Sequence, residues 1–146
     1  MAALNTPLVA GTALLAYLPQ RPPMVLVDAL WQADAKQAQT SFTIQSDTIF
    51  VQDGCFQAPG LLENMAQTAA IRAGWIAKGS PNTLGYMAAI KNTRIYALPT
   101  IQTIITTKIY LNYQTDSFLL YRGFVYVKEQ LMAESDFTIV FAAKNT

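Results

Sequence analysis

The sequence predicts an α+β fold in which one long helix packs against one antiparallel sheet. Only the segment 59–78 has the length and composition of a long helix. Six other segments are rich in the β-branched and aromatic residues that favour strands, and the last three are separated by hairpin-sized gaps. At 146 residues the chain has the size of one domain, so we expect a single domain over residues 1–146.

The composition predicts an oligomer. Hydrophobic residues make up 52% of the chain and charged residues only 13%, whereas charged residues are about 25% of an average soluble protein. A small domain cannot hide this much apolar surface, so we expect part of it at a subunit interface in a dimer or larger assembly. The net charge is +1 without a basic cluster, which argues against nucleic acid as a partner.

The first 58 residues predict a short helix or arm, two strands and a loop. Residues 4–18 are apolar, but no Lys or Arg precedes them and the segment is too short to span a bilayer, so we expect no membrane insertion. Residues 24–34 are rich in Val and Leu, and residues 39–45 alternate polar with apolar side chains, so both are predicted strands. Residues 46–57 are predicted to be a loop with a turn at Asp53-Gly54.

The long helix is predicted over residues 59–78. Pro59 suits a first helical position, and Glu63 lies near the positive end of the helix dipole. The helix is apolar around most of its circumference, which indicates a buried helix. Small side chains, which allow close approach of neighbouring elements, recur along it: Ala66, Ala69, Ala70, Ala73, Gly74 and Ala77.

The rest of the chain is predicted to be four strands, because it is rich in Ile, Val, Thr, Tyr and Phe. The predicted strands cover residues 84–96, 100–113, 118–127 and 131–143.

Several kinds of chemistry are excluded by composition. The chain has no histidine and one cysteine, Cys55, so neither an intrachain disulfide nor a zinc site of Cys and His ligands can form. We therefore expect no metal and no cofactor. A lone cysteine is typical of a reducing compartment, and we expect a cytoplasmic protein.

Residues 18–28 form the first motif of functional interest. They read LPQRPPMVLVD, which resembles the LPHR-x-P-[FM]-x-LVD signature of β-hydroxyacyl-acyl carrier protein dehydratases. The family's catalytic histidine follows Leu-Pro, and Gln20 stands at that position here. A glutamine donates and accepts hydrogen bonds but has no pKa near neutrality, so it cannot act as a general base.

A second motif lies on the predicted helix. Residues 59–67 read PGLLENMAQ, which is similar to the PGVLIVE-x-MAQ segment of the same dehydratases, whose Glu is the other catalytic residue. Two residues fewer separate Pro-Gly from Glu63, and the Gly-His-Phe-Pro element that precedes the family's segment is absent. With a third match at residues 85–94, the resemblance covers about residues 15–143. It implies the hotdog fold, in which the sheet wraps around one long central helix.

Five residues are candidates for the site. The resemblance places Glu63 and Gln20 at the family's catalytic positions. The backbone N–H groups near Gly60 and Leu61, at the helix start, are expected to hold the thioester oxygen. Gln67 lies one turn after Glu63 and is expected to contact substrate or orient the carboxylate. Plainer roles stay open: a solvated Glu63, a surface Gln67 and a turn residue at Gln20.

The resemblance also implies a function and partners. We expect a dehydratase-like protein that handles 3-hydroxyacyl thioesters of acyl carrier protein or coenzyme A in fatty acid or polyene-type lipid synthesis. The family's site joins His of one subunit to Glu of the other, so we expect either a homo-oligomer or a heterodimer with a histidine-bearing homologue. Two alternatives stay open: a hotdog thioesterase that uses Glu63, and a non-catalytic acyl-binding or partner subunit. Independent catalysis is doubtful because the chain has no histidine.

Overall fold

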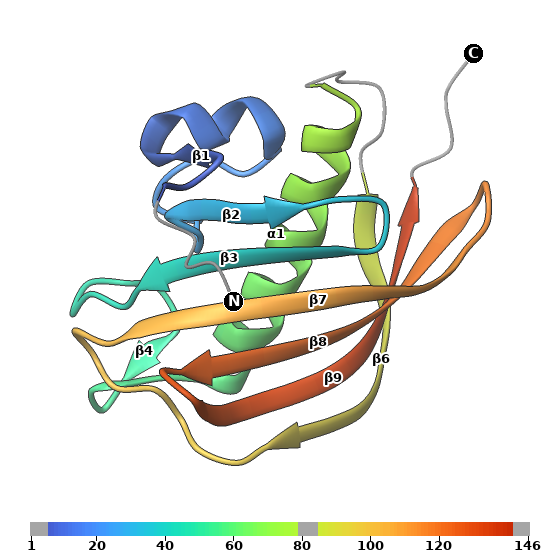
Figure 1. Cartoon of the computed structure of the whole chain (residues 1–146). Helices are drawn as coiled ribbons and strands as arrows, with labels where there is room; N and C mark the ends of the chain where they lie inside the picture. Colours follow the sequence, from blue (N-terminus) through green and yellow to red (C-terminus); the bar gives the residue numbers. More distant parts are fainter. Residues whose placement is uncertain (1–5, 79–84, 142–146) are drawn as a thin grey trace.

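The computed structural model describes residues 6–78 and 85–141 and has the predicted α+β architecture (Figure 1). In chain order the elements are β1 (Val9–Ala10), the 3-10 helix η1 (Gly11–Tyr17), β2 (Ala29–Ala33), β3 (Gln37–Thr43), β4 (Val51–Gln52), β5 (Cys55–Phe56), α1 (Ala58–Ile76), β6 (Gly85–Ile95), β7 (Ile104–Gln114), β8 (Phe118–Val127) and β9 (Gln130–Phe141).

The main sheet has seven strands in the order β1-β2-β3-β7-β8-β9-β6. Every neighbouring pair is antiparallel. The sheet curves around α1, which contacts β2, β3, β6, β7, β8 and β9 (Figure 1). The predicted arrangement of a sheet wrapped around one central helix is therefore present, with β1 and β6 as its two edge strands.

The helix α1 is fixed in the sheet by its apolar face. It follows an extended Gln57 and carries Pro59 in its first turn. Backbone N–H groups in the first turn have no partner within the helix, so the missing N–H of a proline costs no hydrogen bond there. Leu61 and Met65 are fully buried against the sheet. The approach is close at Gly123, where an added Cβ would lie 2.9 Å from the sulfur of Met65.

Several predicted boundaries differ from the structure. The predicted strand 39–45 is β3 over Gln37–Thr43, and the predicted strand 100–113 begins at Ile104. Of the predicted strand 24–34, only β2 pairs with neighbouring strands. The backbone of Met24 and Leu26 forms its hydrogen bonds with side chains of α1 instead. The predicted loop 46–57 contains the short β4–β5 hairpin around the expected turn. Residues 4, 5, 84, 142 and 143 of the predicted elements lie outside the described residues.

A charged cluster lies on the opposite side of β8 and β9 from α1. The Arg122 guanidinium forms ion pairs with Glu134 and Asp136. Hydrogen bonds from the Asn92 amide and, to a smaller extent, from Arg122 lower the pKa of Asp136. Hydrogen bonds from the Tyr96 hydroxyl and, to a smaller extent, from Arg122 lower the pKa of Glu134. These contacts tie β6, β8 and β9 together and are separate from the cavity described next.

Candidate active site

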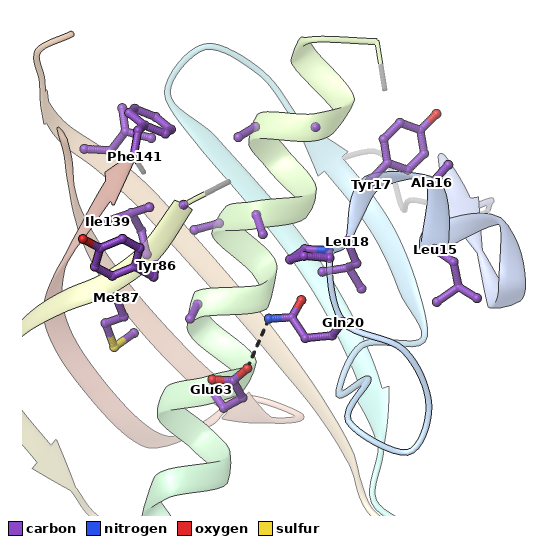
Figure 2. Close-up of a pocket in the computed structure, with 18 of the residues that line it drawn as sticks. Leu15, Ala16, Tyr17, Leu18, Gln20, Glu63, Tyr86, Met87, Ile139 and Phe141 are labelled. Atoms are coloured by element: carbon purple, nitrogen blue, oxygen red, sulfur yellow. Dashed lines mark hydrogen bonds between the residues drawn. The ribbon is translucent and has the colours of Figure 1, made fainter. Parts of the chain in front are cut away.

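A cavity of about 410 Å³ runs along one side of α1. Figure 2 shows η1 and the segment to Gln20 on one side of the helix, and Tyr86, Met87, Ile139 and Phe141 of β6 and β9 on the other. Its volume is within the range of about 300–1,000 Å³ that is usual for small-ligand sites. Its floor is the small-residue face of α1: Ala66, Ala69, Ala70, Ala73 and Gly74.

The small residues of α1 thus have a different use from the one predicted. We expected them to bring neighbouring elements close to the helix, but most of them leave open space instead. Close approach occurs at Gly74, where an added Cβ would lie 3.0 Å from the backbone oxygen of Tyr17. The sequence pattern predicted the small face correctly, but it could not tell a packed face from a cavity floor.

Glu63 lines the cavity at the start of this floor. It is partly buried, and its Oε1 accepts hydrogen bonds from Gln67 Nε2 at 3.1 Å and from Gln20 Nε2 at 3.5 Å (Figure 2). The contact with Gln20 is at the long limit for a hydrogen bond and is therefore weak. No other described residue bonds the Glu63 carboxylate, which leaves Oε2 available to a ligand.

Gln67 holds this carboxylate in place. It is fully buried, and its Nε2 also donates to the backbone oxygen of Met24 while its Oε1 accepts from the backbone N–H of Leu26, both at 2.8 Å. All of its polar groups are used within the protein, and it does not line the cavity. This geometry favours the orienting role over direct substrate contact.

Gln20 reaches the cavity from the segment after η1. Arg21 fixes that segment by donating to the backbone oxygens of Leu18 and Gln20, both at 2.8 Å. The Gln20 side chain presents Nε2 to Glu63. Its Oε1 is buried and has no hydrogen-bond partner among the described residues.

The structure does not bring Gly60 and Leu61 to the cavity. Both backbone N–H groups donate to the backbone oxygen of Gln57, at 2.9 and 3.2 Å, so they are not free to hold a thioester oxygen. Gly60 is needed for packing, because an added Cβ would lie 2.5 Å from the ring of Phe56. The geometry gives the expected thioester contact no support.

The pairing of Gln20 with Glu63 differs from the family's two-subunit site. The resemblance implied that these positions meet across an interface, whereas here both belong to one chain and contact each other directly. The segment after η1 is bonded to α1 through Gln67, which explains why the two side chains meet without a second copy.

A second polar network on α1 was missed by the sequence analysis. Asn64 is fully buried, donates to the backbone oxygen of Leu26 and accepts from Thr107. Thr68 donates to the backbone oxygen of Asn64 and bonds Thr40. These residues attach the helix to the sheet and are not part of the cavity. Their only sequence signal is a polar residue inside an otherwise apolar helix.

Neither a metal site nor a membrane span is found in the described part of the chain. Over residues 6–78 and 85–141, no group of three or more His, Cys, Asp or Glu side chains is placed to bind a metal ion. No described helix is both long enough and apolar enough to cross a membrane.

Solved structures share this fold. The dehydratase heterocomplex ApeI:P from Xenorhabdus doucetiae matches with a TM-score of 0.82 and 20% identity, covering 90% of this chain and 91% of that chain. A hypothetical thioesterase protein with coenzyme A from Streptococcus pneumoniae matches with a TM-score of 0.63 and 9% identity, covering 80% of this chain and 90% of that chain. The PaaI protein of E. coli matches with a TM-score of 0.62 and 10% identity, covering 76% and 80%. The chain therefore has the predicted hotdog fold.

Sequence comparison gives the family. No curated protein matches the chain significantly. A family model described as ApeP-like, ApeP dehydratase, matches residues 12–145. This match includes α1, the segment that carries Gln20 and every strand from β2 to β9. The chain belongs to the ApeP-like dehydratase family.

Proposed function

We propose that the chain binds 3-hydroxyacyl thioesters and acts as a dehydratase-like subunit in fatty acid or polyene-type lipid synthesis. The observation that carries this proposal is the cavity along α1. Glu63 is the one carboxylate among its described lining residues, and the face of α1 beyond it is apolar. A reactive thioester head beside Glu63 and an acyl chain along the alanines would match this distribution of polarity.

Dehydration requires a base at C2 and an acid at the departing C3 hydroxyl. In our proposal the free Oε2 of Glu63 takes the C2 proton, and the same carboxyl then delivers it to the C3 hydroxyl. The C–O bond breaks, a C2–C3 double bond forms and water leaves. Gln20 can take part in neither transfer, because an amide does not titrate near neutrality.

Among the described residues, no His, Asp or second Glu lines the cavity beside Glu63, so we expect slow dehydration by this chain alone. A positioned acid or base contributes about 10²–10⁴-fold to a rate. Because Gln20 and Glu63 meet within one chain, a histidine-bearing homologue would carry both groups in its own site, and we propose that this partner supplies full activity to the complex. The heteromeric relative, ApeI:P, supports this part of the proposal. The thioesterase related in fold, with its coenzyme A, supports a coenzyme A or acyl carrier protein thioester as the ligand. The proposed cytoplasmic location rests on the sequence alone.

The test follows two products from one incubation. Purified chain is mixed with a 3-hydroxyacyl-pantetheine thioester, with and without a histidine-bearing homologue, and enoyl product and free thiol are measured separately. We expect binding and slow enoyl formation by the chain alone, faster formation in the mixture, and no thiol release. Glu63→Gln should lower enoyl formation by the chain alone by about 10²-fold or more. The exposed Glu129→Gln is the matched control.

Other outcomes select the two alternatives. Thiol release that disappears in Glu63→Gln would identify a thioesterase in which the carboxylate activates water. Tight binding without either product, alone and in the mixture, would identify a non-catalytic acyl-binding subunit. Failure to bind any acyl thioester would overturn the proposal itself.

A further inference from the structure

The side-chain oxygen of Gln20 has an unmet hydrogen-bonding capacity. Of the buried side-chain nitrogen and oxygen atoms of the described residues, Gln20 Oε1 alone has no partner. Buried polar atoms in native proteins almost always have one, so an exception beside a cavity needs an explanation. Gln20 lines the cavity while Oε1 itself is turned inward, so a rotation of the side chain would bring this acceptor to the space that a ligand would occupy.

The orientation of the Gln20 amide is set by Glu63. An ionised carboxylate accepts hydrogen bonds only, so the amide must turn Nε2 toward it. The reversed amide would bring two acceptors together. Oε1 therefore points away from Glu63, toward Leu18 (Figure 2).

The neighbouring arginine does not satisfy this oxygen. The Arg21 guanidinium bonds the backbone oxygens of Leu18 and Gln20, not the side chain of Gln20. The floor beyond Glu63 carries methyl groups at Ala66 and Ala70, which cannot donate a hydrogen bond. The missing donor must therefore come from outside the described residues, and a ligand in the cavity can supply it.

We propose that Gln20 Oε1 accepts a hydrogen bond from the 3-hydroxyl of the bound acyl group, and that this contact selects hydroxyacyl over saturated acyl chains. The inference rests on the proposed function. Elimination in that proposal places the C3 hydroxyl beside Glu63, and Gln20 contacts the same carboxylate. The amide thus bonds the acid through its N–H and the departing group through its oxygen. Gln20 is a specificity-determining residue in this proposal and not a proton donor or acceptor.

The expected selectivity follows from the unpaired side-chain oxygen of Gln20. Gln20 Oε1 has no partner before binding, and only a ligand with a correctly placed donor removes that penalty. Sites that hydrogen-bond a substrate hydroxyl discriminate strongly against analogues that lack it. From the usual energetic cost of an unpaired buried group, we expect a preference of about fivefold to about 100-fold.

The experiment compares two ligands that differ by one hydroxyl. The probes are the amides of aminopantetheine with 3-hydroxydecanoic and decanoic acids, in which nitrogen replaces the thioester sulfur so that elimination and hydrolysis do not interfere. Dissociation constants are measured by calorimetry for the unmodified chain, for Gln20→Met, which keeps the length without hydrogen bonding, and for the exposed control Gln45→Met. We expect a preference for the hydroxy probe in the unmodified chain and the control, and equal binding of both probes in Gln20→Met.

Each outcome has one meaning. Equal binding of both probes by the unmodified chain overturns the inference but leaves the proposed function standing, and it requires no variant to fold. Equal weakening of both probes in Gln20→Met also overturns it, because the donor would then belong to the shared pantetheine group. Binding of neither probe counts against the proposed function.

Discussion

Gln67 joins two parts of the candidate site through one side chain. Its amide bonds the Glu63 carboxylate on α1 and the backbone of Met24 and Leu26 in the segment that follows Gln20. A leucine would fill similar space but could replace none of these bonds. The backbone N–H of Leu26, a fully buried residue, would then have no partner.

We predict that Gln67→Leu destabilises the fold. One buried backbone group left unpaired should lower the free energy of unfolding by about 1–3 kcal/mol. Urea denaturation followed by circular dichroism measures it. Gln130→Leu, at an exposed position, should change the same quantity by no more than about 0.5 kcal/mol. Equal stability of the two variants would mean that Gln67 has no such role.

Sequence motifs singled out two side chains that the structure brings together, but they did not predict how these side chains come together. Gln20 and Glu63 were matched to one family site, and the structure places them in contact. The roles expected of Gly60 and Leu61 came from the general behaviour of helix N-termini. That expectation could not include the carbonyl of Gln57, which occupies both N–H groups, because the path of the chain before the helix is not encoded in a local pattern.

The face of α1 that lines the cavity changes from polar to apolar along the helix. Glu63 lies at its start, and Ala66, Ala70 and Ala73 follow at increasing distance. A helix rises about 1.5 Å per residue, so Ala73 lies about 10 Å further along than Ala66. An extended chain advances about 1.2 Å per bond, since three backbone bonds span about 3.6 Å. In the proposed binding mode, position along α1 therefore corresponds to position along the acyl chain.

We predict that leucine at these positions shortens the longest acyl chain that binds. Ala73→Leu should remove binding of long chains only, and Ala66→Leu should move the limit to chains shorter by up to about eight further bonds. Dissociation constants for a series of saturated acyl-pantetheines measure the limit. Ala77→Leu, on an exposed residue just after the helix, is the control. One shared limit for both variants would show that the acyl chain does not follow α1.

Elements with strong local patterns were predicted well. β8 has the predicted bounds, and α1 lies within two residues of its predicted bounds. The segment before β2 was predicted wrongly as a strand, because side chains of Asn64 and Gln67, and not a neighbouring strand, form hydrogen bonds with its backbone. That substitution is a tertiary interaction, so the strand-like composition of residues 24–28 could not reveal it.

At the scale of the whole molecule, the edge strand β6 carries exposed apolar side chains. Tyr86 and Ile90 are 58% and 44% exposed, and within residues 6–78 and 85–141 the only strand that pairs with β6 is β9. Exposed apolar side chains on an open sheet edge are typical of a surface that pairs with another chain. The low charge of the sequence supports the same expectation.

We predict that the chain assembles through β6 into a dimer or larger oligomer, with itself or with a homologue. Ile90→Glu should lower the assembly mass measured by light scattering, because it places a charge in the contact. Ile104→Glu, at an exposed position on β7, should leave the mass unchanged. A monomeric unmodified chain, alone and mixed with a histidine-bearing homologue, would contradict this prediction, as would equal masses of the two variants.

The contact of Gly74 with Tyr17 limits how this pocket can be redesigned. Gly74 has no side chain to remove, and it lies against both backbone and side-chain atoms of Tyr17. Trimming α1 therefore cannot widen the pocket at this end, and even an alanine would press against η1. A protein engineer who wants room for a bulkier ligand should leave residue 74 alone and reshape η1 instead.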